Sequence, residues 1–343
     1  MTPEAFGSGA MELWFYFAQR FAKLEWTSMT QSITGNPKTT TRLTMPADTP
    51  EFPARRASRV VYLEAQPAHI EALGCICFEA FGRLHDLHRV PRDFPERTSA
   101  EKAISLFTLR PEFFGVAAEV EGHLAGANFL STMDEVGGIG PITVAPGFQG
   151  QGFGRGLMDR VLEHAHHKGM REVRLVQEAV NTASLSLYSS LGFAVREPLG
   201  NMIIQPSTIS EPNVRLAKTE DLPQLGELGE RLYGVNRSRE LALWLSLDFK
   251  VLIRERQGKA VGYFMPSKLG HGATDSIEDL LALIGEAGRV VPAESASFLC
   301  PLRNSELFRC ALRAGHRLLK VLNYMTRGKY QPPEGVWTPS YSY

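Results

Sequence analysis

The chain has 343 residues, of which 43% are hydrophobic and 22% are charged, which is typical of a globular protein with about two domains. Its 37 basic residues equal its 37 acidic ones, which argues against a non-specific binder of nucleic acid or of anionic membranes. Its four cysteines form neither a disulfide framework nor a CxxC zinc site. This cysteine usage favours a reducing, cytoplasmic compartment and a protein without a metal. The sequence holds no long apolar run, so no transmembrane helix is expected.

Residues 1–57 are expected to form a largely disordered extension, because residues 27–57 are rich in Thr, Ser and Pro and have no hydrophobic period. From residue 58 to residue 205 strand and helix patterns alternate, which predicts one α/β domain. In chain order we expect a strand (60–63), a helix (68–81), a hairpin (114–120 and 124–130), a strand (140–144), a helix (154–168), a strand (173–176) and a helix (182–191).

After a joint at residues 206–212 the same plan restarts and runs to residue 343. The second copy repeats the strand (214–216), the helix (222–232) and the hairpin (251–265), and a helix is expected at about 276–287. Asn181 and Gly192 match Asn304 and Gly315 at equal spacing. The second copy is shorter between its hairpin and its last helix, the interval that holds a glycine-rich segment in the first copy. Either the fold is duplicated or common Gly and Asn positions match by chance.

That glycine-rich segment, Ile142 to Leu157, is predicted to run from a strand through a loop into a helix. Glycines let the backbone approach a ligand closely, and the first amides of a helix have no intrahelical partner. Together they form a cradle for a phosphate or diphosphate. The segment lacks the Gly-Lys-Ser/Thr of a P-loop and the G-x-G-x-x-G of a dinucleotide site. A glycine turn without a ligand is the alternative.

Gln149-x-x-Gly152-x-Gly154, preceded by Val144-x-Pro146, resembles the coenzyme A motif of the GNAT N-acetyltransferase superfamily. The resemblance implies two GNAT-like α/β domains, each a mixed twisted β-sheet flanked by helices, with acetyl-CoA as co-substrate. It further implies that the strand at Ile142, Thr143 and Val144 holds the pantetheine and supplies an oxyanion donor. The diphosphate would be held by the loop residues Gln149, Gly150, Gln151, Gly152, Phe153, Gly154 and Arg155, with Arg155 either adding a charge or remaining solvated.

A second motif, from Asn181 to Phe193, resembles the family's N-x-x-A-x-x-L-Y-x-x-x-G-F segment, with Ser184 in place of the usual Ala. Asn181 would contact the coenzyme, or serve only as a helix N-cap. The resemblance makes Tyr188 the acid that protonates the leaving thiolate, which is reasonable because a phenol titrates near pKa 10 and a thiol near 8.5. A tyrosine that merely packs in the core is the alternative.

The base that receives the proton of the amine is not assigned by the sequence. Glu178 follows a predicted strand, and Asp134 and Glu135 precede another, so each is a candidate or a surface carboxylate. His85, Asp86 and His88 are expected in a loop after the first helix, where the family binds its acceptor, or form a solvated turn. A water chain without a dedicated base is also compatible with the sequence.

The second copy (206–343) lacks these features, since Ala311 stands opposite Tyr188 and His316 opposite Phe193. We expect it not to bind coenzyme A, but to complete the sheet, cover the acceptor site or pair two chains in a homodimer. The leading hypothesis is an N-acetyltransferase acting on a small-molecule or peptide amine. The alternative is a non-catalytic module that binds or senses coenzyme A.

Overall fold

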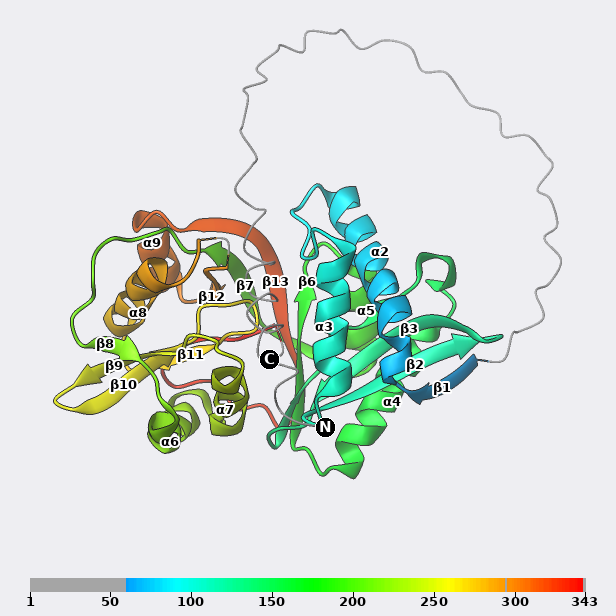
Figure 1. The fold of residues 1–343 in the computed structure, drawn as a ribbon, viewed down its shortest axis with the longest axis horizontal. Coiled ribbons are helices and arrows are strands. Elements are labelled where there is room, and N and C mark those ends of the chain that lie inside the picture. The colour runs from blue at the N-terminus through cyan, green and yellow to red at the C-terminus, as the bar shows by residue number, and fades with distance from the viewer. Residues whose placement is uncertain (1–59, 294, 342–343) are drawn as a thin grey trace, which may run out of the picture.

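The computed structural model describes residues 60–341 apart from residue 294, so the expected extension at 1–57 lies outside the described residues. The chain forms two α/β halves that lie side by side and share strands at their junction (Figure 1). In each half a mixed or antiparallel sheet is covered by helices on both faces, as expected for the duplicated α/β plan. Within the described range no helix is both long and apolar enough to cross a bilayer.

The first half is built on a four-stranded antiparallel sheet in the order β1–β2–β3–β5. Alternate residues of β2 face opposite sides, because side chains alternate along a strand. Val116, Ala118 and Val120 pack with one core, whereas Phe113 and Ala117 pack with another. The strands are β1 (Val60–Glu64), β2 (Phe113–Val120), β3 (His123–Ser131), β4 (Val136–Gly138), β5 (Thr143–Val144), β6 (Glu172–Glu178) and β7 (Ala194–Ile203).

The helices of the first half divide between these two cores. Helices α2 (Ile70–His88) and α3 (Arg97–Leu109) cover one face, with Leu73, Ile104 and Phe107 buried against the sheet. Helices α4 (Phe153–His167) and α5 (Thr182–Ser190) cover the other face (Figure 1). The burial of α4 follows from apolar residues at helical spacing, Leu157, Met158 and Val161.

The second half repeats this arrangement. Its sheet has the order β14–β11–β10–β9–β8, with α6 and α7 on one face and α8 and α9 on the other. The strands are β8 (Val214–Leu216), β9 (Leu252–Arg256), β10 (Lys259–Phe264), β11 (Gly272–Thr274), β12 (Ser297–Pro301), β13 (Arg317–Gly328) and β14 (Val336–Thr338). The helices are α6 (Leu222–Tyr233), α7 (Ser238–Ser246), α8 (Ile277–Val290) and α9 (Ser305–Arg313).

The two halves exchange their last strands in a third sheet, ordered β12–β7–β13–β6–β4. Strand β13 of the second half lies between β6 and β7 of the first half and pairs antiparallel with both. Reciprocally, β7 pairs with β12 of the second half, and its residue Met202 packs into that half's core. The predicted boundary at residues 205 and 206 therefore follows β7 directly, and β7 pairs on both sides with strands of the second half, β12 and β13.

Two local predictions were wrong. The helix expected at 68–81 continues as α2 to His88, because Gly82 does not end it but lies against the Arg92 side chain; a Cβ there would be 3.2 Å from the guanidinium. The strand expected at 140–144 is reduced to Thr143–Val144. Before it, Ile139 forms a bridge with Leu130, and the Gly140 amide donates to the Phe129 carbonyl at 2.9 Å.

The second half buries a histidine beside an ion pair. His271 is 1% exposed, its Nδ1 is hydrogen-bonded to the Tyr263 hydroxyl at 3.0 Å, and the Arg237–Glu240 pair lies beside it. Burial lowers the pKa of His271 well below its ordinary value, and the Arg237 guanidinium lowers it further. His271 therefore stays neutral in the folded chain at pH values where an unfolded histidine takes up a proton.

We expect the free energy of unfolding to fall as the pH drops below about 6.5. In this range the histidine of the unfolded chain becomes protonated, whereas His271 of the folded chain stays neutral. This group contributes up to about 1.4 kcal/mol per pH unit to the slope. His271→Gln should flatten the slope measured by urea unfolding between pH 7 and pH 5. The same change at exposed His166 is the control. Equal slopes for His271→Gln and the unaltered chain would contradict the assignment.

Candidate functional site

The glycine loop, defined here as residues 149–155, follows β5 and runs into the first turn of α4, in the strand–loop–helix order that the sequence predicted. Gly150 and Gly152 have φ values of +74° and +89°, in the left-handed region that favours glycine. A Cβ added at either position would meet no atom within 4 Å, so the space above the loop is open. Residues 149–152 and Arg155 are exposed, whereas Phe153 is buried against Phe148 and anchors the loop to the core.

The N-terminus of α4 points its free amides into this open space. Gly152 is the N-cap residue, and the first hydrogen bond of the helix runs from the Gly156 amide to the Gly152 carbonyl at 3.1 Å. The amides of 153–155 therefore have no intrahelical partner. The first turn holds no acidic residue, so the positive end of the helix dipole is not neutralised. These features fit an anionic group such as a diphosphate.

The polar side chains of the loop hold its shape. Gln149 donates to the Val144 carbonyl at 3.0 Å, and Gln151 donates to the Gly147 carbonyl at 2.9 Å. Arg155 donates to the Ser190 hydroxyl of α5 at 2.6 Å. Arg155 therefore lies exposed at the edge where α4 and α5 meet, beside the free amides.

Strands β5 and β6 separate next to the loop. The parallel pairing of β4 with β6 ends where the Ile139 amide donates to the Arg174 carbonyl at 2.8 Å. Strand β5 then follows β3, with the Ala145 amide bonded to the Ala125 carbonyl at 2.8 Å. Since backbone groups alternate along a strand, Ile142 and Val144 direct theirs away from β3. Within residues 60–341, residue 294 aside, β5 has no ladder partner on that edge.

Helix α5 carries the second predicted motif on the same face. The Asn181 side chain accepts from the Ser184 amide at 3.1 Å, so Asn181 is an N-cap, one of its two predicted roles. Tyr188 is 6% exposed and packs beside Phe193, with ring centroids 6.2 Å apart. Burial raises the pKa of Tyr188 above its ordinary value, so the phenol stays protonated and has a proton to donate.

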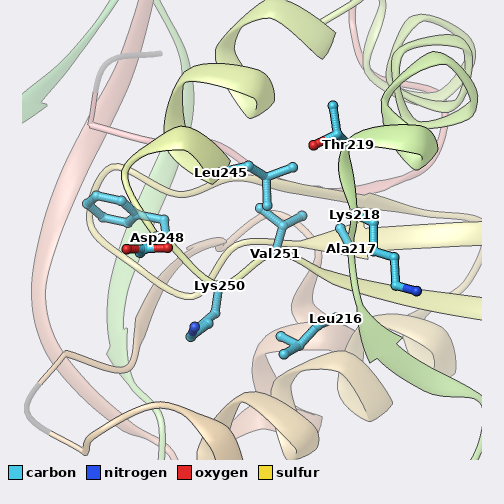
Figure 2. Close-up of a pocket in the computed structure, with 9 residues that line it drawn as sticks. Leu216, Ala217, Lys218, Thr219, Leu245, Asp248, Lys250 and Val251 are labelled. Atoms are coloured by element: carbon cyan, nitrogen blue, oxygen red, sulfur yellow. The ribbon is translucent and has the colours of Figure 1, made fainter. Parts of the chain in front are cut away.

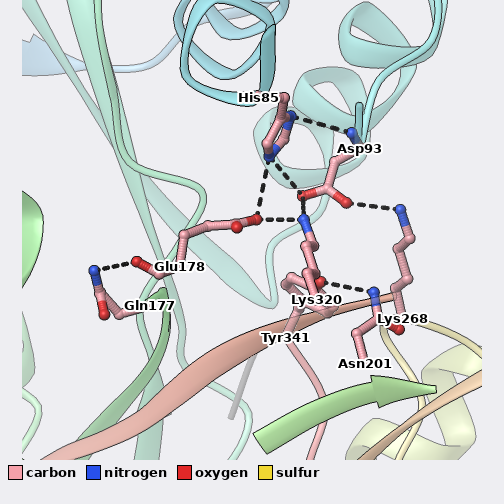
Figure 3. Close-up of polar contacts among 8 residues, drawn as sticks. All are labelled: His85, Asp93, Gln177, Glu178, Asn201, Lys268, Lys320 and Tyr341. Atoms are coloured by element: carbon pink, nitrogen blue, oxygen red, sulfur yellow. Dashed lines mark hydrogen bonds and ion pairs between the residues drawn. The ribbon is translucent and has the colours of Figure 1, made fainter. Parts of the chain in front are cut away.

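The three carboxylates that the sequence offers as candidate bases lie in different surroundings. Glu135 is exposed and pairs with Arg171 at 3.0 Å, and Asp134 is half-buried in the same loop. Glu178 is buried at the end of β6, where its Oε1 lies 3.2 Å from His85 Nε2 (Figure 3). Val173 and Leu175 of β6 pack with the α4 core, whereas Val176 packs with Leu322 and Tyr324 on the opposite face, the face that also carries Glu178. Glu178 therefore lies across the sheet from Tyr188.

His85, Asp86 and His88 were expected in a loop, but all three lie in the last turns of α2. His85 is fully buried, and its Nδ1 accepts from the Asp93 amide at 3.4 Å, so its Nε2 carries the proton toward Glu178. Asp86 instead forms an exposed ion pair with Arg92. The histidine therefore belongs to a buried cluster, and its two neighbours do not.

Sequence reasoning missed the other members of this cluster, Asp93 and Lys320. Lys320 Nζ contacts Glu178 Oε1 and lies 2.8 Å from Asp93 Oδ2, and all of these groups are nearly or fully buried. The acids and His85 have ligand atoms within 4.8 Å of one another, a spacing that a metal ion could use. The Lys320 ammonium already places a cation between the two carboxylates. We call His85, Asp93, Glu178 and Lys320 the acceptor-side cluster.

The second half differs at the helix N-terminus and at the strand edge that correspond to those of the candidate site. Helix α8 begins with Glu278 and Asp279, and its N-cap Ser276 accepts from the Asp279 amide, so its N-terminus is acidic and capped. Strand β14 pairs with the edge of β11, the strand that corresponds to β5. Trp337 of β14 lies between Tyr233 and Tyr324. The chain's own C-terminal segment thus fills the edge that stays open in the first half.

A shallow cavity of about 250 Å³ lies in the second half, between β8 and the end of α7 (Figure 2). Leu216, Thr219 and Val251 line it together with the exposed Lys218 and Lys250. None of its lining residues belongs to the glycine loop, to α5 or to the acceptor-side cluster. This cavity is therefore separate from the candidate site.

The comparisons with known proteins agree with this geometry. The model of the Acetyltransferase (GNAT) family matches residues 81–193, which hold the loop, β6 and α5. Mycothiol acetyltransferase of Renibacterium salmoninarum is 36% identical over 78 residues, 23% of each chain. An uncharacterized N-acetyltransferase of Methanocaldococcus jannaschii is 34% identical over 86 residues, 23% of this chain and 38% of its own. The chain spans only 23% to 29% of the first three curated relatives that it matches.

Solved structures extend the likeness to both halves. A putative acetyltransferase from Pyrococcus horikoshii has a TM-score of 0.67 at 15% identity, covering 85% of this chain and 99% of its own. The glucosamine N-acetyltransferase region of a fungal β-N-acetylglucosaminidase has a TM-score of 0.57 at 12% identity, covering 80% of this chain and 39% of its own. At these identities the likeness shows the fold alone.

Proposed function

Because this chain belongs to the acetyltransferase (GNAT) family through its domain at residues 81–193, we propose that it transfers an acetyl group from acetyl-CoA to a primary amine. The observation that carries this proposal is the open, uncapped N-terminus of α4 beside the unpaired edge of β5. The acetyltransferase relatives support the same activity. The domains are proposed to divide as 58–205, which binds the coenzyme, and 206–343, which does not.

The donor would bind along the α4 and α5 face. The free amides of the glycine loop and Arg155 would hold the diphosphate, and the backbone of Ile142 and Val144 would hold the pantetheine. Thioester chemistry then needs an oxyanion donor, and an amide on the unpaired edge of β5 can serve. Asn181, fixed as the N-cap of α5, lies at the end of β6 and would contact the coenzyme from there.

The chemistry requires one group that gives a proton and one that takes a proton. The amine nitrogen forms a bond to the acyl carbon as the carbon–sulfur bond breaks, and Tyr188 donates its proton to the thiolate. The amine gives its protons to Glu178 and to solvent, from which Tyr188 recovers its own. Overall, one ammonium and one thioester yield one amide, one thiol and one proton.

Glu178 suits the proton-taking role better than Asp134 or Glu135, for reasons of placement. Its Oε1 is held by His85 and Lys320, while no described residue donates to Oε2. It lies on the face of the sheet opposite Tyr188, so amine and thioester would meet between β5 and β6 from opposite sides. This arrangement supports direct attack in a ternary complex, in which orientation supplies much of the acceleration.

Incubation of the protein with acetyl-CoA and a broad panel of primary amines, from polyamines to peptide N-termini, tests the proposal. Release of free thiol that depends on the amine is the expected result. Tight coenzyme A binding without thiol release from any amine would instead favour a non-catalytic coenzyme A module. Absence of both coenzyme A binding and turnover would contradict both functions.

Tyr188→Phe should lower kcat by roughly 10²-fold or more, because the leaving thiolate loses its proton donor. The affinity for coenzyme A, measured by calorimetry, should change little, since the ring still fills the core. Tyr233→Phe is the matched control, because it removes the hydroxyl of another buried tyrosine, one that lies in the second half. If Tyr188→Phe lost coenzyme binding and stability together with turnover, the tyrosine would be structural.

A further inference from the structure

We propose that Lys320, on strand β13 of the second half, is a positioning residue that orients Glu178 of the first half for the acetyl transfer. The proposal rests on the proposed function, and it gives the second half, which lacks the glycine loop, a role in catalysis. Four observations carry it: the strand exchange, the backbone irregularity at Lys320, the pattern of contacts around Glu178, and the burial of all the groups involved.

The strand exchange brings Lys320 to the site. Leu322 of β13 lies directly opposite Glu178 of β6, and Lys320, two residues earlier, projects from the same face. The pairing of β13 with β7 shifts register between Leu318 and Lys320, which is a β-bulge. A bulge re-aims the side chain next to it and is frequent near active sites. The bulge therefore sets the direction of Lys320 at the end of β6.

The contacts show why Glu178 depends on Lys320. The ammonium is shared between Glu178 Oε1 and Asp93 Oδ2, and His85 Nε2 approaches the same Glu178 oxygen from α2 (Figure 3). Two donors on Oε1 fix the carboxylate plane and leave Oε2 for the amine. Burial alone would lower the pKa of Lys320, but Asp93 and Glu178 outweigh it and raise that pKa above its ordinary value.

Asp93, Lys268 and Tyr341 also lie around Glu178 and Lys320. Burial alone would raise the pKa of Asp93, but Lys268, Lys320 and His85 hold it below its ordinary value. Lys268, on the loop between β10 and β11, contacts Asp93 Oδ1 at 2.8 Å, whereas Lys320 contacts the other oxygen of Asp93, Oδ2 (Figure 3). Tyr341 covers the cluster, with its ring centre 6.0 Å from Lys320 Nζ and its amide bonded to the Lys268 carbonyl at 2.9 Å.

The test compares Lys320→Met with the full-length chain, using acetyl-CoA and whichever primary amine of the panel is turned over fastest. We expect Lys320→Met to lower kcat by about 10²-fold through misorientation of Glu178, while KM for acetyl-CoA changes by less than about threefold. Without the ammonium the ionised carboxylate is less favourable, so the ascending limb of the pH profile of kcat/KM moves to higher pH. Lys320→Arg keeps the charge and should keep that limb in place.

Lys268→Met is the matched control, because it removes the cation on Asp93 Oδ1 and leaves the one that Glu178 and Asp93 share; its kcat should stay within about threefold of the unaltered chain. If Lys320→Met does not fold, the double variant Lys320→Met/Asp93→Asn removes one charge of each sign and replaces it in the test. A folded variant that binds acetyl-CoA and keeps both kcat and the pH profile overturns the role of Lys320 alone. An unaltered chain that turns over no amine overturns the proposed function and this inference with it.

Discussion

A chain that ends at Gln205 should fail to fold, although it contains the whole of the proposed coenzyme-binding domain at residues 58–205. Strand β13, which this fragment lacks, pairs with β6 from Leu322 to Gly328 and with β7 from Arg317 to Thr326. Leu322, Tyr324 and Met325 of β13 are fully buried. Without them β6 and β7 lose their shared partner, and their apolar faces and unpaired edges are exposed.

Circular dichroism during heating measures this outcome. The fragment 1–205 should show no cooperative transition, whereas the full chain should show one. Co-expression with residues 206–343 should restore the transition, because the second fragment supplies β13 in trans. A fragment that unfolds cooperatively on its own and is stabilised by coenzyme A would show that the boundary at 205 separates independent domains.

Gly152→Glu should abolish the stabilisation of the full chain by coenzyme A. The new carboxylate would stand at the N-terminus of α4, where the diphosphate is proposed to bind, and would repel it. For a ligand at about a hundred times its Kd the lost stabilisation is about 2.7 kcal/mol, which corresponds to several degrees in Tm. Thermal unfolding with and without coenzyme A measures the loss.

Gly122→Glu controls for strain and charge in this experiment. Gly122 has a φ of +80° in the turn between β2 and β3, and a Cβ there also meets no atom within 4 Å. The two variants therefore share the same backbone cost and the same added charge, but only one lies at the glycine loop. Equal shifts with coenzyme A in both variants would contradict the placement of the diphosphate.

Local patterns predicted the shape of the glycine loop and the start of α4, because their signals are short-range. Alternating glycines before an apolar helical stripe specify a loop and an open helix N-terminus without reference to the rest of the chain. The Asn181 and Asn304 N-caps, each followed by a glycine of positive φ, are likewise local and appear as predicted in both halves. The duplication could therefore be recognised before any tertiary contact was known.

The acceptor-side cluster could not be predicted in the same way. Asp93 and Lys320 are separated by 227 positions, and nothing in their neighbourhood distinguishes them from surface charges. They meet only because β13 inserts between β6 and β7, a pairing that no local period encodes. The extension of α2 to His88 was also missed, because Gly82, expected to end the helix, is buried against the Arg92 side chain within it.

Calorimetric titration of coenzyme A into the full-length chain tests most directly whether the main-chain amides of residues 149–155 form a diphosphate site. We expect one saturable binding event per chain, because among the residues that the structure describes only the first half has an uncapped helix N-terminus beside an unpaired strand edge. No heat at millimolar coenzyme, or two equivalent sites per chain, would contradict it.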